Sequence, residues 1–149
     1  MAGKAYHLNI HHLCYIISVE IFGDAMSINP LAAPDKFFVL GKATTRAANE
    51  LSLSNAALSR VIGLSEPSIS RIASGARGID PESKEGQLSL LVVRLFRSLD
   101  PLVGSDAKKR VDWLRSYNKS LNGKPATLIE TPQGLVTTLA YLDGMRAAA

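Results

Sequence analysis

The polar side chains with the clearest chemical potential lie close together in the sequence, between residues 54 and 77. Serine, asparagine and glutamate can form hydrogen bonds with base edges, and arginine can pair with guanine or with phosphate oxygens. The chemistry indicated is therefore binding of a nucleic acid. The residues that we expect to contact DNA are Asn55, Arg60, Ser65, Glu66, Ser68, Ser70, Arg71 and Arg77.

Two short helices joined by a tight turn would position these side chains. Apolar residues recur at helical spacing on the inner faces: Leu58, Val61, Ile62, Ile69 and Ile72. Gly63 suits the turn and Gly75 suits the end of the second helix. Ser65 is a favoured N-cap, and Pro67 falls in the first turn, where a missing N–H costs little. The pattern predicts a helix-turn-helix, and an ordinary helical hairpin is the alternative.

The composition agrees with a small helical protein that has a polyanionic partner. The chain has 149 residues, of which 46% are hydrophobic and 6% aromatic, and its net charge is +4. Such a chain can bury a core in one domain or two small ones. No sustained alternation of period two indicates a sheet. The single cysteine, Cys14, excludes an internal disulfide and fits the cytoplasm, and no apolar run suggests a membrane partner.

Residues 1–33 are expected to form an N-terminal extension of unknown role. Their apolar run, 13–22, is interrupted by Glu20 and lacks an A-x-A cleavage pattern, which disfavours a signal peptide. Met26 is a possible alternative start. The histidines of this segment and Cys14 match no familiar metal-site spacing, so neither a metal nor another cofactor is expected.

Residues 34–103 are expected to form the helix-turn-helix domain, opened by Asp35 at a helix start. Its last helix carries apolar residues at helical spacing: Leu88, Leu91, Val92, Leu95, Phe96 and Leu99. Leu90 and Val93 widen this face, so the helix should be buried within the fold or at a subunit interface. We expect these two residues to form a homodimer contact, and the helix to end near Pro101.

Residues 104–149 are expected to form a second small helical domain. Ser105 is the expected cap of a helix that extends to Leu121, and a turn follows at 122–125. Thr131 and Pro132 have the order of an N-cap and a first helical residue, so they should open the last helix. Gly144 lies near the end of that helix.

The residues from Trp113 onward resemble a known family. Glycine and proline stand at fixed offsets among apolar and polar positions: Trp113, Leu114, Asn118, Leu121, Gly123, Pro125, Leu128, Thr131, Gly134, Val136 and Leu139. This order closely resembles the toxin-binding domain of Xre/MbcA/ParS-type antitoxins. With the helix-turn-helix before it, the resemblance spans about residues 34–145. One departure is Ile72-Ala73, where many Xre-like recognition helices carry an aromatic residue followed by glutamate.

The resemblance implies an antitoxin with two binding functions. One end would bind the operator of its own operon, as a dimer on paired half-sites, and the other would neutralise a RES-type toxin that consumes NAD. Neutralisation is thought to be steric, with the C-terminal region covering the toxin's NAD cleft. The expected toxin-binding residues are Trp113, Tyr141, Gly144, Met145 and Arg146. With Gly144 as the stop, Met145 and Arg146 would form a projecting arm, whereas Trp113 and Tyr141 suit a core as well as an interface.

An enzyme is the competing class of protein, and the sequence offers little for one. It has no paired-carboxylate cluster, glycine-rich phosphate loop or metal-ligand spacing, so no catalytic residue is assigned. The more serious alternative is a ligand-responsive helix-turn-helix repressor without a toxin partner.

Overall fold

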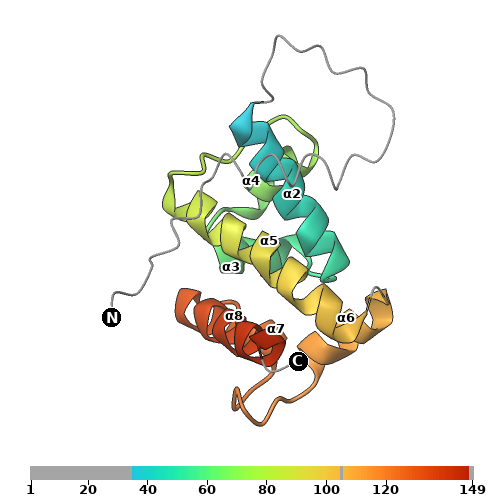
Figure 1. Ribbon diagram of the computed structural model, residues 1–149. Helices are drawn as coiled ribbons and strands as arrows, with labels where there is room; N and C mark the ends of the chain where they lie inside the picture. Colours follow the sequence, from blue (N-terminus) through green and yellow to red (C-terminus); the bar gives the residue numbers. More distant parts are fainter. Residues whose placement is uncertain (1–34, 105, 148–149) are drawn as a thin grey trace.

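Seven helices make up the secondary structure of the described residues, 35–104 and 106–147, in a computed structural model of the chain (Figure 1). In chain order they are α2 (Lys36–Glu50), α3 (Asn55–Ile62), α4 (Glu66–Ala73), α5 (Lys84–Val103), α6 (Ala107–Arg115), α7 (Pro125–Leu128) and α8 (Pro132–Ala147). The one β-type pairing among these residues is an isolated antiparallel bridge between Asn118 and Gly123. The predicted all-α fold is confirmed.

Helix α5 runs through the middle of the fold (Figure 1). It packs against α2 and α3 on one side and against α8 on the other, with α6 near its end. Val92, Leu95 and Leu99 are completely inaccessible to solvent. A helix that is apolar on several sides needs cover on several sides, and here the chain itself supplies that cover.

The two residues expected at a dimer contact lie in different surroundings. Val93 is 4% exposed and belongs to the core. The structure therefore corrects the prediction for Val93, because its own chain already covers the side chain. Leu90 is only partly buried where it packs against the same core, so it stays a predicted contact residue.

The predicted helix starts rest on local hydrogen bonds. The side chain of Asp35 accepts a hydrogen bond from the backbone N–H of Phe37, and Ser54 accepts one from Ala57. Thr131 Oγ1 accepts one from the backbone N–H of Gly134 at 3.1 Å. Each bond satisfies a donor that a helix start leaves without an intrahelical partner.

The predicted end of α5 at Pro101 is wrong. Pro101 lies inside the helix, which continues to Val103 and stops at Gly104, where φ is +80°. A proline in the last turn removes only one backbone hydrogen bond there. Leu102 and Val103 are partly buried against the core, and this packing outweighs the local preference of the residue before proline.

The segment after α5 also differs from its prediction. Helix α6 begins after Asp106, whose carboxylate accepts hydrogen bonds from the backbone of Lys108 and Lys109, and it ends at Arg115 and not at Leu121. The chain then folds back on itself through the bridge between Asn118 and Gly123. The one-turn helix α7 that follows was not predicted.

Gly144, weighed above as a stop, does not end α8, which continues to Ala147. A glycine ends a helix when it adopts a positive φ, and Gly144 does not. Gly134, in contrast, is required for close packing. A Cβ atom there would lie 2.0 Å from the carbonyl oxygen of Leu128, so only glycine lets α8 start this close to α7.

Candidate functional site

Helices α3 and α4 form the predicted helix-turn-helix. Gly63 has φ +77° and donates its N–H to the carbonyl of Ser59 at 2.9 Å, which ends α3 with a left-handed residue. Ser65 caps α4, accepting from the backbone N–H of Ser68 at 3.4 Å. The five apolar residues of the predicted inner faces are all buried: Leu58, Val61, Ile62, Ile69 and Ile72. Both the register and the turn of the motif are confirmed.

The end of α4 is anchored without the aromatic residue that many related helices carry. Ile72 is buried and lies against Gly41 of α2, so closely that a Cβ on Gly41 would be 3.0 Å from Ile72 Cγ2. Gly75 has φ +76°, and Ala76 and Arg77 both donate their backbone N–H to the carbonyl of Arg71. The second helix is thus fixed against α2 by close packing and by its C-terminal hydrogen bonds.

The exposed face of this motif carries most of the predicted DNA contacts. Glu66, Ser70 and Arg71 are exposed along α4, and Asn55 is exposed at the first turn of α3. Ser65 is exposed too, although its hydroxyl is used as the cap. The structure therefore places the first turn of α3 and the outer face of α4 where a groove and its phosphates could reach them.

Ser68 is a correction to the predicted contact face. It is 8% exposed, and its hydroxyl lies 3.0 Å from the hydroxyl of Ser65. Arg77 donates a hydrogen bond from Nη1 to Ser68 Oγ at 2.9 Å. Because Ser68 is buried and its hydroxyl is hydrogen-bonded to Arg77, it connects α4 to the loop that follows and does not face a groove.

Arg60, one of the expected DNA contacts, forms an ion pair with Glu130. Its Nε donates to Glu130 Oε2 at 2.9 Å, and its Nη2 donates to Oε1 at 2.8 Å. The hydrogen bond from Arg60 lowers the pKa of Glu130, and the same bond raises the pKa of Arg60. Glu130 lies between α7 and α8, so this ion pair joins the helix-turn-helix to the C-terminal segment.

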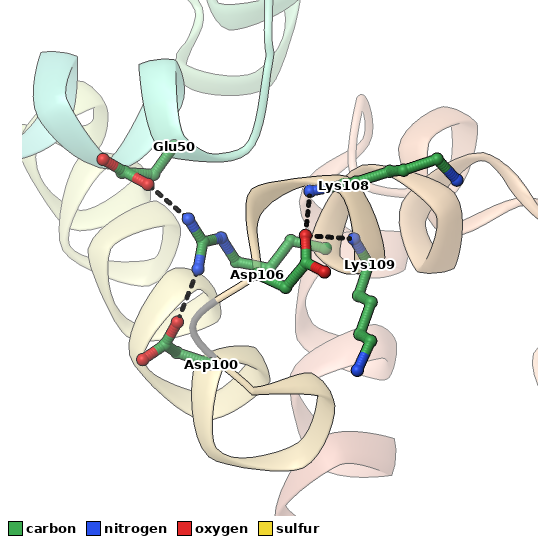
Figure 2. A network of polar contacts seen from close by, with 6 residues as sticks. Glu50, Asp100, Asp106, Lys108 and Lys109 are labelled. Carbon is green, nitrogen blue, oxygen red and sulfur yellow. Dashed lines mark hydrogen bonds and ion pairs between the residues drawn. The ribbon is translucent and has the colours of Figure 1, made fainter.

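A second network, centred on Arg110 of α6, was also missed. Figure 2 shows Glu50 and Asp100 reaching towards the guanidinium group that lies between them, with hydrogen bonds of 2.5 and 2.7 Å. Arg110 is 4% exposed, and the Cζ atom of its guanidinium lies over the ring of Phe96, 5.5 Å from the ring centroid. Because Glu50 belongs to α2 and Asp100 to α5, Arg110 ties three helices together.

The predicted toxin-binding residues lie on α6 and α8. The rings of Trp113 and Tyr141 are stacked, with centroids 6.5 Å apart and planes 24° apart, and both are partly buried against the core. Met145 and Arg146 are exposed, but in the last turn of α8, so they form no projecting arm. Two further exposed apolar side chains, Tyr117 and Val136, were not among the predicted site residues.

Val136 is one of the residues that carry the family resemblance, and its side chain is 54% exposed. Helix α8 is apolar on most of its circumference, so its sequence does not reveal which side is buried.

The described part of the chain shows neither a metal-ligand cluster nor a membrane-spanning helix. It contains no cluster of three or more His, Cys, Asp or Glu residues that could hold a metal ion. None of its helices combines the length and apolar character needed to cross a bilayer. The three histidines and Cys14, which were weighed as metal ligands, lie outside the described residues.

Comparison with protein families agrees with this geometry. The model of the antitoxin Xre-like helix-turn-helix domain matches residues 39–94. The model of the antitoxin Xre/MbcA/ParS C-terminal toxin-binding domain matches residues 98–147. No curated protein matches the chain. Fold and matches together define an antitoxin that carries a helix-turn-helix. The chain belongs to the Xre/MbcA/ParS-type antitoxins.

Proposed function

We propose that this antitoxin neutralises a RES-type, NAD-degrading toxin through its C-terminal domain and represses its own operon by binding operator DNA in the cytoplasm. The observation that carries the proposal is the order of the two matched domains, a helix-turn-helix directly followed by a toxin-binding domain. In such an arrangement one chain can sense free toxin and adjust the supply of both proteins.

The DNA side of the proposal is supported by the exposed face of α4. Ser70 and Arg71 are both exposed on that face, and arginine paired with guanine is the commonest specific contact in a major groove. A single helix-turn-helix contacts few base pairs, so a homodimer on paired half-sites is part of the proposal. Leu90 is the candidate contact residue that the fold leaves partly accessible.

The toxin side is supported by the surface of α8. Its last turn exposes Met145 and Arg146, one apolar and one cationic side chain. An exposed apolar side chain beside a cationic one suits a protein partner, because burying the apolar group supplies free energy and the charge selects the partner. We propose that this end of α8 contacts the toxin.

Co-expression with the adjacent toxin gene tests both halves. Cells producing the toxin alone should lose NAD and stop growing, and the wild-type antitoxin should restore both. Met145→Asp combined with Arg146→Glu should abolish rescue while DNA binding persists, and Arg71→Ala should do the reverse. A neighbouring protein that neither co-purifies with the chain nor depletes NAD would contradict the proposal. DNA binding that a metabolite abolishes, without such a partner, would instead identify a ligand-responsive repressor.

A further inference from the structure

The ion pair between Arg60 and Glu130 connects the two functional parts of the molecule. Arg60 lies in the last turn of α3, directly before the turn of the helix-turn-helix, and Glu130 lies between α7 and α8. Seventy positions separate the two residues in the sequence. Both oxygens of the carboxylate are engaged, by Nε at 2.9 Å and by Nη2 at 2.8 Å.

The pair is also placed beside the recognition helix and is open to solvent. The side chains of Arg60 and Glu130 are 55% and 30% exposed. The pKa of Arg60 is raised first by its hydrogen bond with Glu130, and to a smaller extent by the charge of Glu66, the first residue of α4. Arg60 is thus near the end of α4 that a helix-turn-helix directs towards bases.

A DNA phosphate offers Arg60 the same kind of partner as Glu130 does. Both present two oxygens that a guanidinium can bind with parallel hydrogen bonds. Exposed ion pairs contribute little free energy, so a phosphate can replace the carboxylate of Glu130 at a small cost in free energy. Each arginine that pairs with a phosphate also releases a condensed counterion from the duplex, which favours the exchange at low salt.

We propose that Arg60 exchanges between Glu130 and a DNA phosphate, so that Glu130 weakens DNA binding from within the toxin-binding domain. This proposal rests on the DNA binding proposed above and adds a determinant of affinity that lies outside the helix-turn-helix. Coupling between two sites is reciprocal. When a DNA phosphate binds Arg60, Glu130 therefore loses its partner, and the junction between α7 and α8 loses this contact with α3.

Titration of a random-sequence 30-base-pair duplex, followed by fluorescence anisotropy over a series of salt concentrations, tests the exchange. Glu130→Gln should bind up to about fivefold more tightly than the wild type, since the carboxylate no longer competes. Arg60→Gln should bind more weakly, with a slope of log affinity against log salt smaller by about one. In the double variant, Glu130→Gln should have no effect.

Asp143→Asn is the matched control. Asp143 also belongs to the C-terminal segment and also pairs with an exposed arginine, Arg94 of α5, so its loss changes the net charge equally. Equal tightening by Asp143→Asn, or tightening by Glu130→Gln in the Arg60→Gln background, would overturn the exchange. So would an unchanged affinity of Glu130→Gln. This test uses a random duplex and so does not depend on operator recognition. Operator recognition is tested separately: equal affinity for the random duplex and for the region upstream of the gene would contradict it.

Discussion

The buried Arg110 network should contribute measurably to stability, and Arg110→Met tests this. Methionine keeps most of the apolar stem in place but removes the guanidinium that Glu50 and Asp100 share. Removing one member of a fully buried ion pair costs about 3–5 kcal/mol, since the remaining charge stays buried. Here the side chains of Glu50 and Asp100 are 50% and 38% exposed, so water can solvate both after the substitution.

The expected loss is therefore smaller than for a fully buried pair. Two hydrogen bonds to charged groups contribute about 1.5–3 kcal/mol each at most, and partial exposure of the acceptors reduces this. We expect Arg110→Met to lower the free energy of unfolding by about 2 kcal/mol. Glu50→Gln and Asp100→Asn should each cost about 1 kcal/mol, because each leaves the other carboxylate in place.

Urea unfolding followed by circular dichroism measures these differences, with the slope m compared among variants. Arg115→Ala is the control, because Arg115 is exposed on the same helix and its loss should change the free energy by less than about 0.5 kcal/mol. If Arg110→Met were as stable as the wild type, the reasoning would be refuted. The free-energy cost of desolvating the guanidinium would then equal the gain from its hydrogen bonds. The network would orient the three helices without stabilising the fold.

Three other predictions concern single positions. Arg71→Ala should weaken operator binding by about 1–3 kcal/mol in an anisotropy titration, with the free energy of unfolding unchanged. Gly134→Ala should destabilise the protein by about 2–3 kcal/mol in urea, because its Cβ would meet the backbone of Leu128, whereas Gly144→Ala should be neutral or slightly stabilising. The hydrogen bond from Arg60 lowers the pKa of Glu130, so the ionised carboxylate stabilises the folded protein. At pH 7 the wild type should therefore be more stable than Glu130→Gln, and this difference should disappear as the pH falls through the lowered pKa of Glu130. Unfolding curves recorded from pH 7 downwards would show a constant difference if this were wrong.

The features that sequence reasoning predicted correctly are those set by residues two to four positions apart. The caps at Asp35, Ser65 and Thr131 depend on a side chain and a backbone N–H in the same turn. The left-handed residues Gly63 and Gly75 are likewise local requirements. Such features need no knowledge of the tertiary fold.

The errors occurred where distant parts of the chain decide the structure. Pro101 stays helical because the core holds the turn after it. Ser68 is buried and hydrogen-bonded to an arginine nine positions further on, which a helical projection of α4 does not contain. The partner of Arg60 is seventy positions away and cannot be inferred from spacing. The burial of Val93 likewise depends on how the other helices pack around α5.

The central position of α5 bears on how independent the two functions can be. Both family matches include part of this helix, since the first ends at residue 94 and the second begins at residue 98. The buried face of α8, formed by Leu135, Leu139 and Leu142, is covered by packing against α5. The same helix carries the core contacts of α2 and α3. The two proposed binding surfaces are thus both connected to α5, that of α8 directly and that of α4 through α2 and α3, and the ion pair of Arg60 adds a second connection between them. A partner that displaces α8, or the junction before it, would therefore disturb the same set of packed helices to which α4 is fixed.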